Sequence, residues 1–331
     1  MPRPGCLLVL AATLSLAACG GKGPGAPSPV EPGIPAGTAL TFLSGETAEP
    51  VAGAAVTVAG RSFTSGATGE IVLAERVPLG NAMDVTANGF LERQTVLRSA
   101  TVTRFTLWPS TSPTGLTEAI SAAIVYTSST CPFDAAQSGR SPLERLRPGV
   151  SQVAVAVSSE IAADPAAQAA VMAGVGTINT ATQGRVTYFI GSQAGGEAAT
   201  FTLVVDPQDT GCLVLRHAAT TYPTFSPAGI TGGKMVFCSL QAARDPLLVT
   251  HELGHTFGFG HSPDPADMMF CAGTLRRDFS PREALLMALM LQRSPGNRFP
   301  DDDRSATAAA ARSRQIIQSL SPPPAWVMAP S

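Results

Sequence analysis

The 331-residue chain has few charged residues, and the two signs nearly balance. Asp, Glu, Lys and Arg make up 14% of the residues, and the formal net charge is −2. Such a chain has no broad basic surface, which argues against a nucleic-acid partner. Histidine is scarcer still, with four residues, and there are three tyrosines and two tryptophans. Any chemistry that requires imidazole must therefore come from very few positions.

The N-terminus has an apolar run, residues 6–18, which is too short for a membrane-spanning helix of about 20 residues. Following the positive charge of Arg3, it fits the hydrophobic part of a secretory signal. The run ends in Leu16-Ala17-Ala18-Cys19, which resembles the lipobox of bacterial lipoproteins. The resemblance implies that residues 1–18 are a signal peptide and that an acylated Cys19 anchors the mature chain to a membrane.

The same resemblance implies an extracytoplasmic protein of the bacterial cell envelope. Gly20 stands where lipoproteins retained in the inner membrane have an aspartate, which favours an outer-membrane anchor. Residues 19–37 are rich in Gly and Pro, a composition typical of a linker between an anchor and a folded domain. The alternative is an ordinary secretory peptide with an incidental Cys19.

Cysteine usage agrees with export. Apart from Cys6 and Cys19 the chain has four cysteines, and an even number in an exported protein predicts two disulfides. These four are Cys131, Cys212, Cys238 and Cys271. Three pairings are open, and the absence of a CxxC spacing argues against a four-cysteine zinc site. A reactive thiolate at Cys271 is a weaker alternative to a structural bridge.

Residues 38–110 favour an all-β domain. Short, partly alternating runs separated by glycines, without helical periodicity, lie at 52–60, 69–77, 82–90 and 101–108. The sequence from PVAGAAVTVAG to VTANGFLERQTVLR resembles a carboxypeptidase regulatory-like β-sandwich. The region has no cluster of catalytic residue types, which favours a role as a spacer or adhesion module.

Residues 111–300 combine both kinds of secondary structure. Four strands are predicted, at 150–159, 184–191, 197–206 and 232–239. Three helices are predicted to begin at a capping residue followed by proline, namely Asp164-Pro165, Asp245-Pro246 and Ser280-Pro281. Glu283 would complete a capping box with Ser280. The order of these elements predicts an α+β domain built around one mixed sheet.

Three of the four histidines lie in the eleven-residue stretch HELGHTFGFGH, residues 251–261. His251 and His255 are four residues apart, so on a helix their rings project from one face and can share a zinc ion. Glu252 lies about 100° further round that helix, where it can reach a water on the metal without binding the metal. Gly258 is expected to end the helix in the left-handed conformation, which allows His261 to return as a third ligand.

This stretch resembles the HExxHxxGxxH motif of the metzincin zinc metallopeptidases at all five defining positions. In ADMMF, residues 266–270, Met269 lies eight residues after His261, the spacing of the methionine turn in the matrixin-like branch. The resemblance implies a catalytic domain with a mixed twisted sheet and long helices, and zinc bound by the three histidines. It also implies Glu252 as general base and a protein or peptide as substrate.

Several features depart from the matrixins. No cysteine-switch motif precedes the domain, and His217, predicted to be a surface or strand-end residue, is the only other histidine. The acidic triplet 301–303 is predicted to be a solvated turn, and residues 301–331 a disordered or partly helical tail. The alternative function is a non-catalytic, zinc-binding surface lipoprotein that acts as a binding or structural module. The sequence leaves the oligomeric state open.

Overall fold

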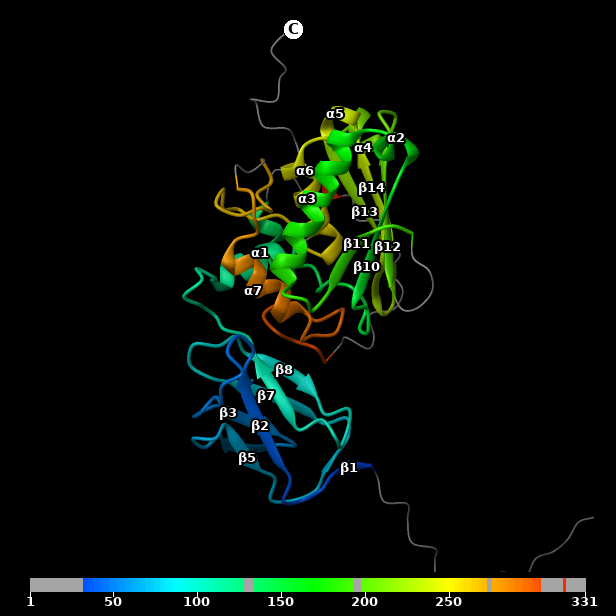
Figure 1. The fold of residues 1–331 in the computed structure, drawn as a ribbon. Coiled ribbons are helices and arrows are strands. Elements are labelled where there is room, and N and C mark those ends of the chain that lie inside the picture. The colour runs from blue at the N-terminus through cyan, green and yellow to red at the C-terminus, as the bar shows by residue number, and fades with distance from the viewer. Residues whose placement is uncertain (1–31, 128–133, 193–197, 273–275, 305–317, 320–331) are drawn as a thin grey trace, which may run out of the picture.

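The computed structural model describes residues 32–127, 134–192, 198–272, 276–304 and 318–319 (Figure 1). The predicted signal peptide, Cys19 and Cys131 lie outside the described residues, as does most of the linker. The fold is mixed α+β, as predicted. Among the described residues, none of the helices combines the length and apolar character needed to cross a membrane.

The N-terminal part consists of short strands in two main sheets (Figure 1). One has the order β5-β2-β9, and the other has the order β4-β3-β7-β8. The strands are β2 (Ala39–Ser44), β3 (Ala55–Val58), β4 (Arg61–Thr64), β5 (Glu70–Val72), β7 (Ala82–Thr86), β8 (Arg93–Val96) and β9 (Arg104–Leu107), with β1 (Gly33–Ile34) paired to β6 (Val77–Pro78). Alternate residues such as Val56, Val58, Met83 and Val85 are buried in one hydrophobic cluster shared by the two sheets.

The C-terminal part contains one six-stranded sheet of order β11-β10-β12-β14-β13-β15. Its strands are β10 (Gln152–Val157), β11 (Thr187–Ile190), β12 (Ala199–Val205), β13 (Ala219–Ser226), β14 (Gly229–Phe237) and β15 (Gln318–Ser319). β10, β11, β12 and β14 are parallel, whereas β13 pairs antiparallel with both β14 and β15. The sequence did not predict β13, and the strand expected at 232–239 is longer and begins at Gly229.

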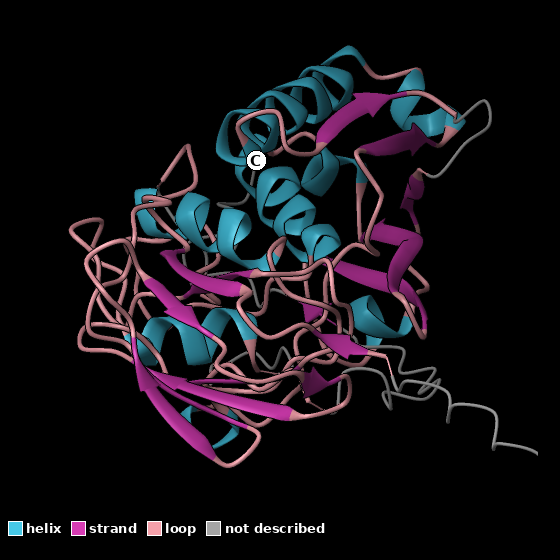
Figure 2. Ribbon diagram, turned by 90° about the horizontal axis from the view of Figure 1, so that it is seen from below, coloured by secondary structure: helices cyan, strands magenta, loops and turns pink. Residues whose placement is uncertain are grey.

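The three predicted long helices are present: α3 (Pro165–Thr182), α6 (Pro246–Phe257) and α7 (Pro281–Met290). Their predicted N-caps, Asp164, Asp245 and Ser280, each accept a hydrogen bond from the backbone of the first turn. The described residues also form α1 (Glu118–Val125), α2 (Ser159–Ala162), α4 (Thr210–Leu213), α5 (Leu240–Ala243) and a short 3-10 turn at Ala135–Gln137. Figure 1 shows α3, α6 and α7 on one side of the six-stranded sheet, and Figure 2 shows the fold from below.

Helix α6 is held between α3 and the sheet. A Cβ atom on Gly174 of α3 would lie 3.0 Å from Val249 Cγ1 and 3.1 Å from Leu253 Cδ1 of α6, so this glycine permits the close approach of the two helices. Leu253 and Phe257 are fully buried and anchor α6 in the core. The helix that carries two of the three motif histidines is therefore fixed on more than one side.

The acidic triplet 301–303 is not the solvated turn that the sequence predicted. Asp301 is fully buried and pairs with Arg293, also fully buried, at 2.6 Å. The Asp301 carbonyl accepts a hydrogen bond from Gln94 N of β8, and Asp303 is buried beside Arg93. The partner of Asp303 lies 210 residues away, so the local sequence does not show that this part of the acidic run is buried. Residues 305–317 and 320–331 of the predicted tail lie outside the described residues, and residues 318–319 form β15.

Candidate metal centre

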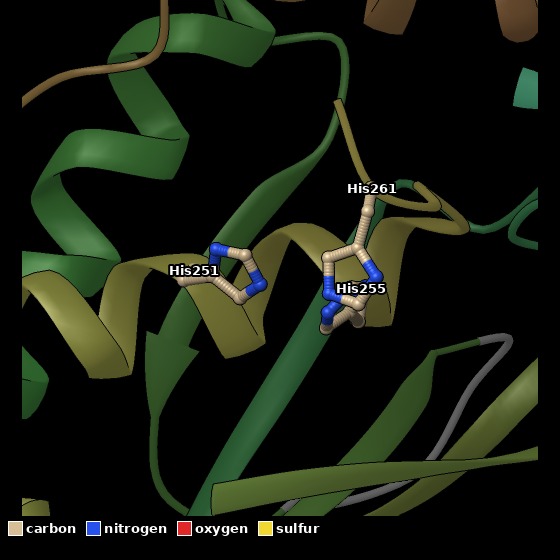
Figure 3. A group of neighbouring side chains, drawn as sticks. All are labelled: His251, His255 and His261. Atoms are coloured by element: carbon tan, nitrogen blue, oxygen red, sulfur yellow. The ribbon is translucent and has the colours of Figure 1, made fainter. Parts of the chain in front are cut away.

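The structure brings His251, His255 and His261 together (Figure 3). One ring nitrogen from each lies within 4.8 Å of the others, and the ring centroids are 4.8–5.3 Å apart. The three side chains are at most 1% exposed. His217, by contrast, lies just before β13 outside this group; it is a strand-end residue as predicted, but is buried rather than on the surface.

The local sequence explains how the third histidine reaches the other two. Gly258 ends α6 in the left-handed conformation with φ of 112°, and a Cβ atom there would overlap the Glu144 carbonyl. The chain then reverses, and Gly260 N donates a hydrogen bond to Ile124 O at 2.7 Å. The backbone of α1 thus fixes the reversal that directs His261 toward α6.

Backbone carbonyls orient two of the rings. His251 Nδ1 lies 2.8 Å from Met268 O, and His255 Nδ1 lies 2.8 Å from Phe259 O. Since a carbonyl only accepts, each Nδ1 carries the proton, and each Nε2 has a free lone pair. Burial lowers the pKa of His251 to about 4 and that of His255 well below its usual value, so both rings are neutral.

These two Nε2 atoms have the properties of metal ligands. Both are buried, and no described residue supplies a hydrogen-bond partner to either. Buried acceptors in proteins are almost always satisfied, and neutral imidazole nitrogens that lie close together are the donor set that a divalent transition metal satisfies. The histidine cluster therefore fits a zinc ion.

Glu252 lies on the same helix and is fully buried. Its Oε2 accepts a hydrogen bond from Thr221 Oγ1 at 2.5 Å, and no described residue is hydrogen-bonded to its Oε1. Burial raises the pKa of Glu252 to about 8, and the hydrogen bond from Thr221 opposes this shift. A carboxyl group with a pKa near neutrality can both accept and return a proton.

Thr221 was missed because strand β13 was missed. Pro223 interrupts the run ATTYPTFS, and proline within a run of β-formers argues against a strand except near a sheet edge. The β-branched and aromatic residues of this run were the available signal. The position of Thr221 next to Glu252 depends on the pairing of β13 with β14 and on the packing of the sheet against α6.

Met268 and Met269, the predicted methionine turn, lie next to the histidine-bearing helix α6. Met268 and Met269 are fully buried, and Met268 supplies the carbonyl bound to His251. Glu283 of α7 accepts hydrogen bonds from Met268 N at 3.1 Å, Met269 N at 2.8 Å and Ser280 N at 2.6 Å. The capping box predicted from Ser280 and Glu283 is confirmed, but the sequence did not show that the same carboxylate fixes the methionine turn.

A second carboxylate closes the loop between His261 and the methionine turn. Asp267 accepts hydrogen bonds from Ser262 Oγ at 2.5 Å, Ser280 Oγ at 2.7 Å and Arg282 Nε at 2.8 Å. Ser262 N also donates to Met269 O at 2.8 Å. The residue after His261 is thereby tied both to the methionine turn and to α7, which restricts the position of His261.

Protein-family models and curated proteins were both searched, and neither search finds a match for the chain.

One of the predicted disulfides is formed by Cys212 and Cys238, with Cα atoms 5.4 Å apart. It joins α4 to the residue after β14, and so clamps the two ends of the segment that contains β13. Cys271, which follows the methionine turn, is also disulfide-bonded, which argues against the reactive-thiolate alternative. Cys131 lies outside the described residues.

Gly254 provides a test of the packing under the histidines. A Cβ atom at this position would overlap Met269 Sδ, so Gly254→Ala should displace the methionine turn and the carbonyl that orients His251. We expect a loss of about 1–3 kcal/mol in stability, as for overpacked cores, together with weaker zinc binding in a competition titration. Gly176→Ala on α3 is the control, because no atom lies within 4 Å of its added Cβ and helix propensity should stabilise it by about 0.5–1 kcal/mol. If the two variants had the same stability and the same zinc affinity, Gly254 would not be needed for the packing of Met269 under the histidines.

Proposed function

We propose that the protein is a zinc-dependent endopeptidase. The observation that carries the proposal is the convergence of three buried histidines beside Glu252, a fully buried carboxyl group whose Oε1 has no hydrogen-bond partner among the described residues. Three protein ligands leave a coordination position free, which distinguishes catalytic from structural zinc sites. When bound, zinc would lower the pKa of a water ligand and polarise a substrate carbonyl.

The residues of the chain have separate tasks in this proposal. Glu252 accepts a proton from the attacking water and delivers it to the leaving amine. Thr221 holds the Glu252 carboxylate through the bond to Oε2. The carbonyls of Met268 and Phe259 keep His251 and His255 in the tautomer that presents Nε2. Burial of all these groups keeps bulk water away from the reacting atoms.

Two further features support the same proposal. The HELGHTFGFGH sequence and its methionine turn resemble those of the metzincins, and the mixed sheet with its long active-site helix is compatible with a matrixin-like catalytic domain. The N-terminal sheets are compatible with a carboxypeptidase regulatory-like β-sandwich. We also propose that the protein is a lipoprotein of the bacterial cell envelope, anchored through Cys19.

The function is tested by metal analysis combined with digestion of a mixed peptide library. We expect one zinc ion per chain, internal cleavage of peptides, and loss of cleavage in a chelator that is reversed by added zinc. One bound zinc without cleavage of any peptide would instead favour the non-catalytic, zinc-binding surface lipoprotein.

The anchor is tested by replacing Cys19. The wild-type chain should partition with membranes and begin at an acylated cysteine, whereas Cys19→Ala should yield an unacylated species. A wild-type chain that is entirely soluble and cleaved at another position would contradict the lipoprotein proposal without affecting the zinc site.

Thr221 should influence the pH dependence of hydrolysis. Its hydrogen bond lowers the pKa of Glu252, and Glu252 acts as a base only when ionised, so activity falls as the pH drops through this pKa. Thr221→Val removes the bond, and should move the acidic limb of the kcat/KM profile to higher pH by about one unit, the equivalent of 1.36 kcal/mol. Thr221→Ser retains the hydroxyl and should restore the profile. If the acidic limb of the kcat/KM profile is at the same pH in Thr221→Val as in the wild type, this hydrogen bond does not set the pKa of Glu252.

A further inference from the structure

Strand β13 borders the site and has a neighbour from the far end of the sequence. On one side it pairs with β14, and on the other with β15, in the register Thr220↔Ser319 and Thr221↔Gln318. Figure 1 shows this C-terminal segment, in red, next to β13. The residue that is hydrogen-bonded to Glu252 is thus itself paired with a residue of the C-terminal region.

Without β15, strand β13 would be the edge of the sheet. An edge strand presents unpaired N–H and C=O groups, and extended peptides are often recognised by adding a strand to such an edge. Backbone hydrogen bonds give affinity in this mode with little dependence on sequence. Thr221 is the strand residue that is hydrogen-bonded to Glu252. A peptide paired with β13 at Thr221 would therefore place its backbone close to Glu252, where a peptidase needs its substrate.

We propose that the Gln318–Ser319 segment occupies the edge of β13 in the intact chain, and that it competes there with an extended peptide substrate. The inference rests on the proposed endopeptidase function. The C-terminal segment then competes with substrate, and hydrolysis requires its displacement.

The size of the effect follows from tethering. An attached segment competes at an effective concentration on the order of 1 mM. If the free segment binds the open edge with a Kd of about 0.1 mM, then about one chain in ten has the edge open, and the apparent affinity for substrate falls by the same factor. Removing the segment should therefore raise kcat/KM about tenfold, mainly through a lower KM.

Two variants release the edge in different ways. One ends after Arg304, and the other is the otherwise intact chain with Gln318→Pro and Ser319→Pro. Neighbouring residues of an antiparallel strand direct their N–H groups to opposite sides, and proline has none, so the double substitution removes any hydrogen bond donated to β13 from these two positions. The control is the intact chain with Ala308→Pro and Ala309→Pro, which leaves Gln318 and Ser319 unchanged.

Two measurements are made on each chain: hydrolysis of a quenched fluorescent peptide, and binding of a labelled peptide of residues 312–325 by fluorescence anisotropy. We expect both edge-releasing variants to cleave about tenfold faster at low substrate concentration, and to bind the labelled peptide more tightly than the wild type and the control do. The free peptide should inhibit the truncated chain competitively, whereas a scrambled peptide of the same composition should not.

The outcomes separate this proposal from the one on which it rests. No hydrolysis by any zinc-loaded chain would overturn the endopeptidase function, while peptide binding would still show whether the segment occupies the edge. Equal kcat/KM and equal peptide binding for wild type and both edge variants would overturn the occupancy proposal alone. Self-association of the truncated chain with unchanged kcat/KM would also overturn it, because β15 would then only cap the edge against aggregation.

Discussion

Glu252→Gln is expected to lower kcat/KM for peptide hydrolysis by about 10²–10⁴-fold, the usual contribution of a general acid–base group. Glutamine keeps the size of the side chain and an oxygen that can accept the hydrogen bond from Thr221, so the strand contact is retained. It cannot accept a proton from water near neutral pH. The three histidines are unaltered, and the zinc content should therefore equal that of the wild type.

The comparison with His255→Ala gives this test its specificity. That variant loses one of the two Nε2 atoms of α6, and should lose zinc affinity together with activity. Glu160→Gln, on an exposed residue of α2, is the matched control for the change of charge and should leave both properties unaltered. A Glu252→Gln enzyme that cleaves peptides at a rate close to that of the wild type would refute Glu252 as the base, although zinc could still bind.

The parts of the site that the sequence predicted are those determined by local geometry. The spacing of His251 and His255, the left-handed Gly258 and the helices that begin with proline depend on residues at most four positions apart. A single helix or turn fixes such relations, whatever the rest of the chain does. The α+β class followed from the same local patterns.

The parts that it did not predict depend on contacts between distant segments. Thr221 meets Glu252 across 31 residues, and Asp301 lies beside Gln94 although more than 200 residues separate them. Glu283 was recognised as a helix cap, but its hydrogen bonds to Met268 and Met269 depend on how α7 packs against the loop. Hydrophobic periodicity carries no information about such pairings, because it reports only which face of an element is buried.

The buried pair Arg293–Asp301 should dominate the stability of the junction between the two parts of the chain. Both side chains are fully buried, and two hydrogen bonds of 2.6 Å join them. Arg293 also donates to Thr106 of β9 at 2.7 and 2.8 Å, and its guanidinium lies 5.1 Å from the ring centroid of Trp108. Asp301→Ala would leave a buried cation without its counter-charge, and should cost about 3–5 kcal/mol in urea unfolding.

In Asp301→Ala the loss of stability comes mainly from the unpaired charge of Arg293 rather than from the lost contact. A double variant can test this. Arg293→Met with Asp301→Leu removes both charges and keeps apolar volume, so it should be less destabilised than Asp301→Ala. Glu75→Ala breaks the surface ion pair with Arg61. The side chains of Glu75 and Arg61 are 66% and 49% exposed, so this change should cost less than about 1 kcal/mol in stability. If Asp301→Ala costs no more than Glu75→Ala, the acidic triplet does not join the two parts. If it costs the expected amount while zinc content per folded chain is unchanged, the junction stabilises the fold independently of the metal centre.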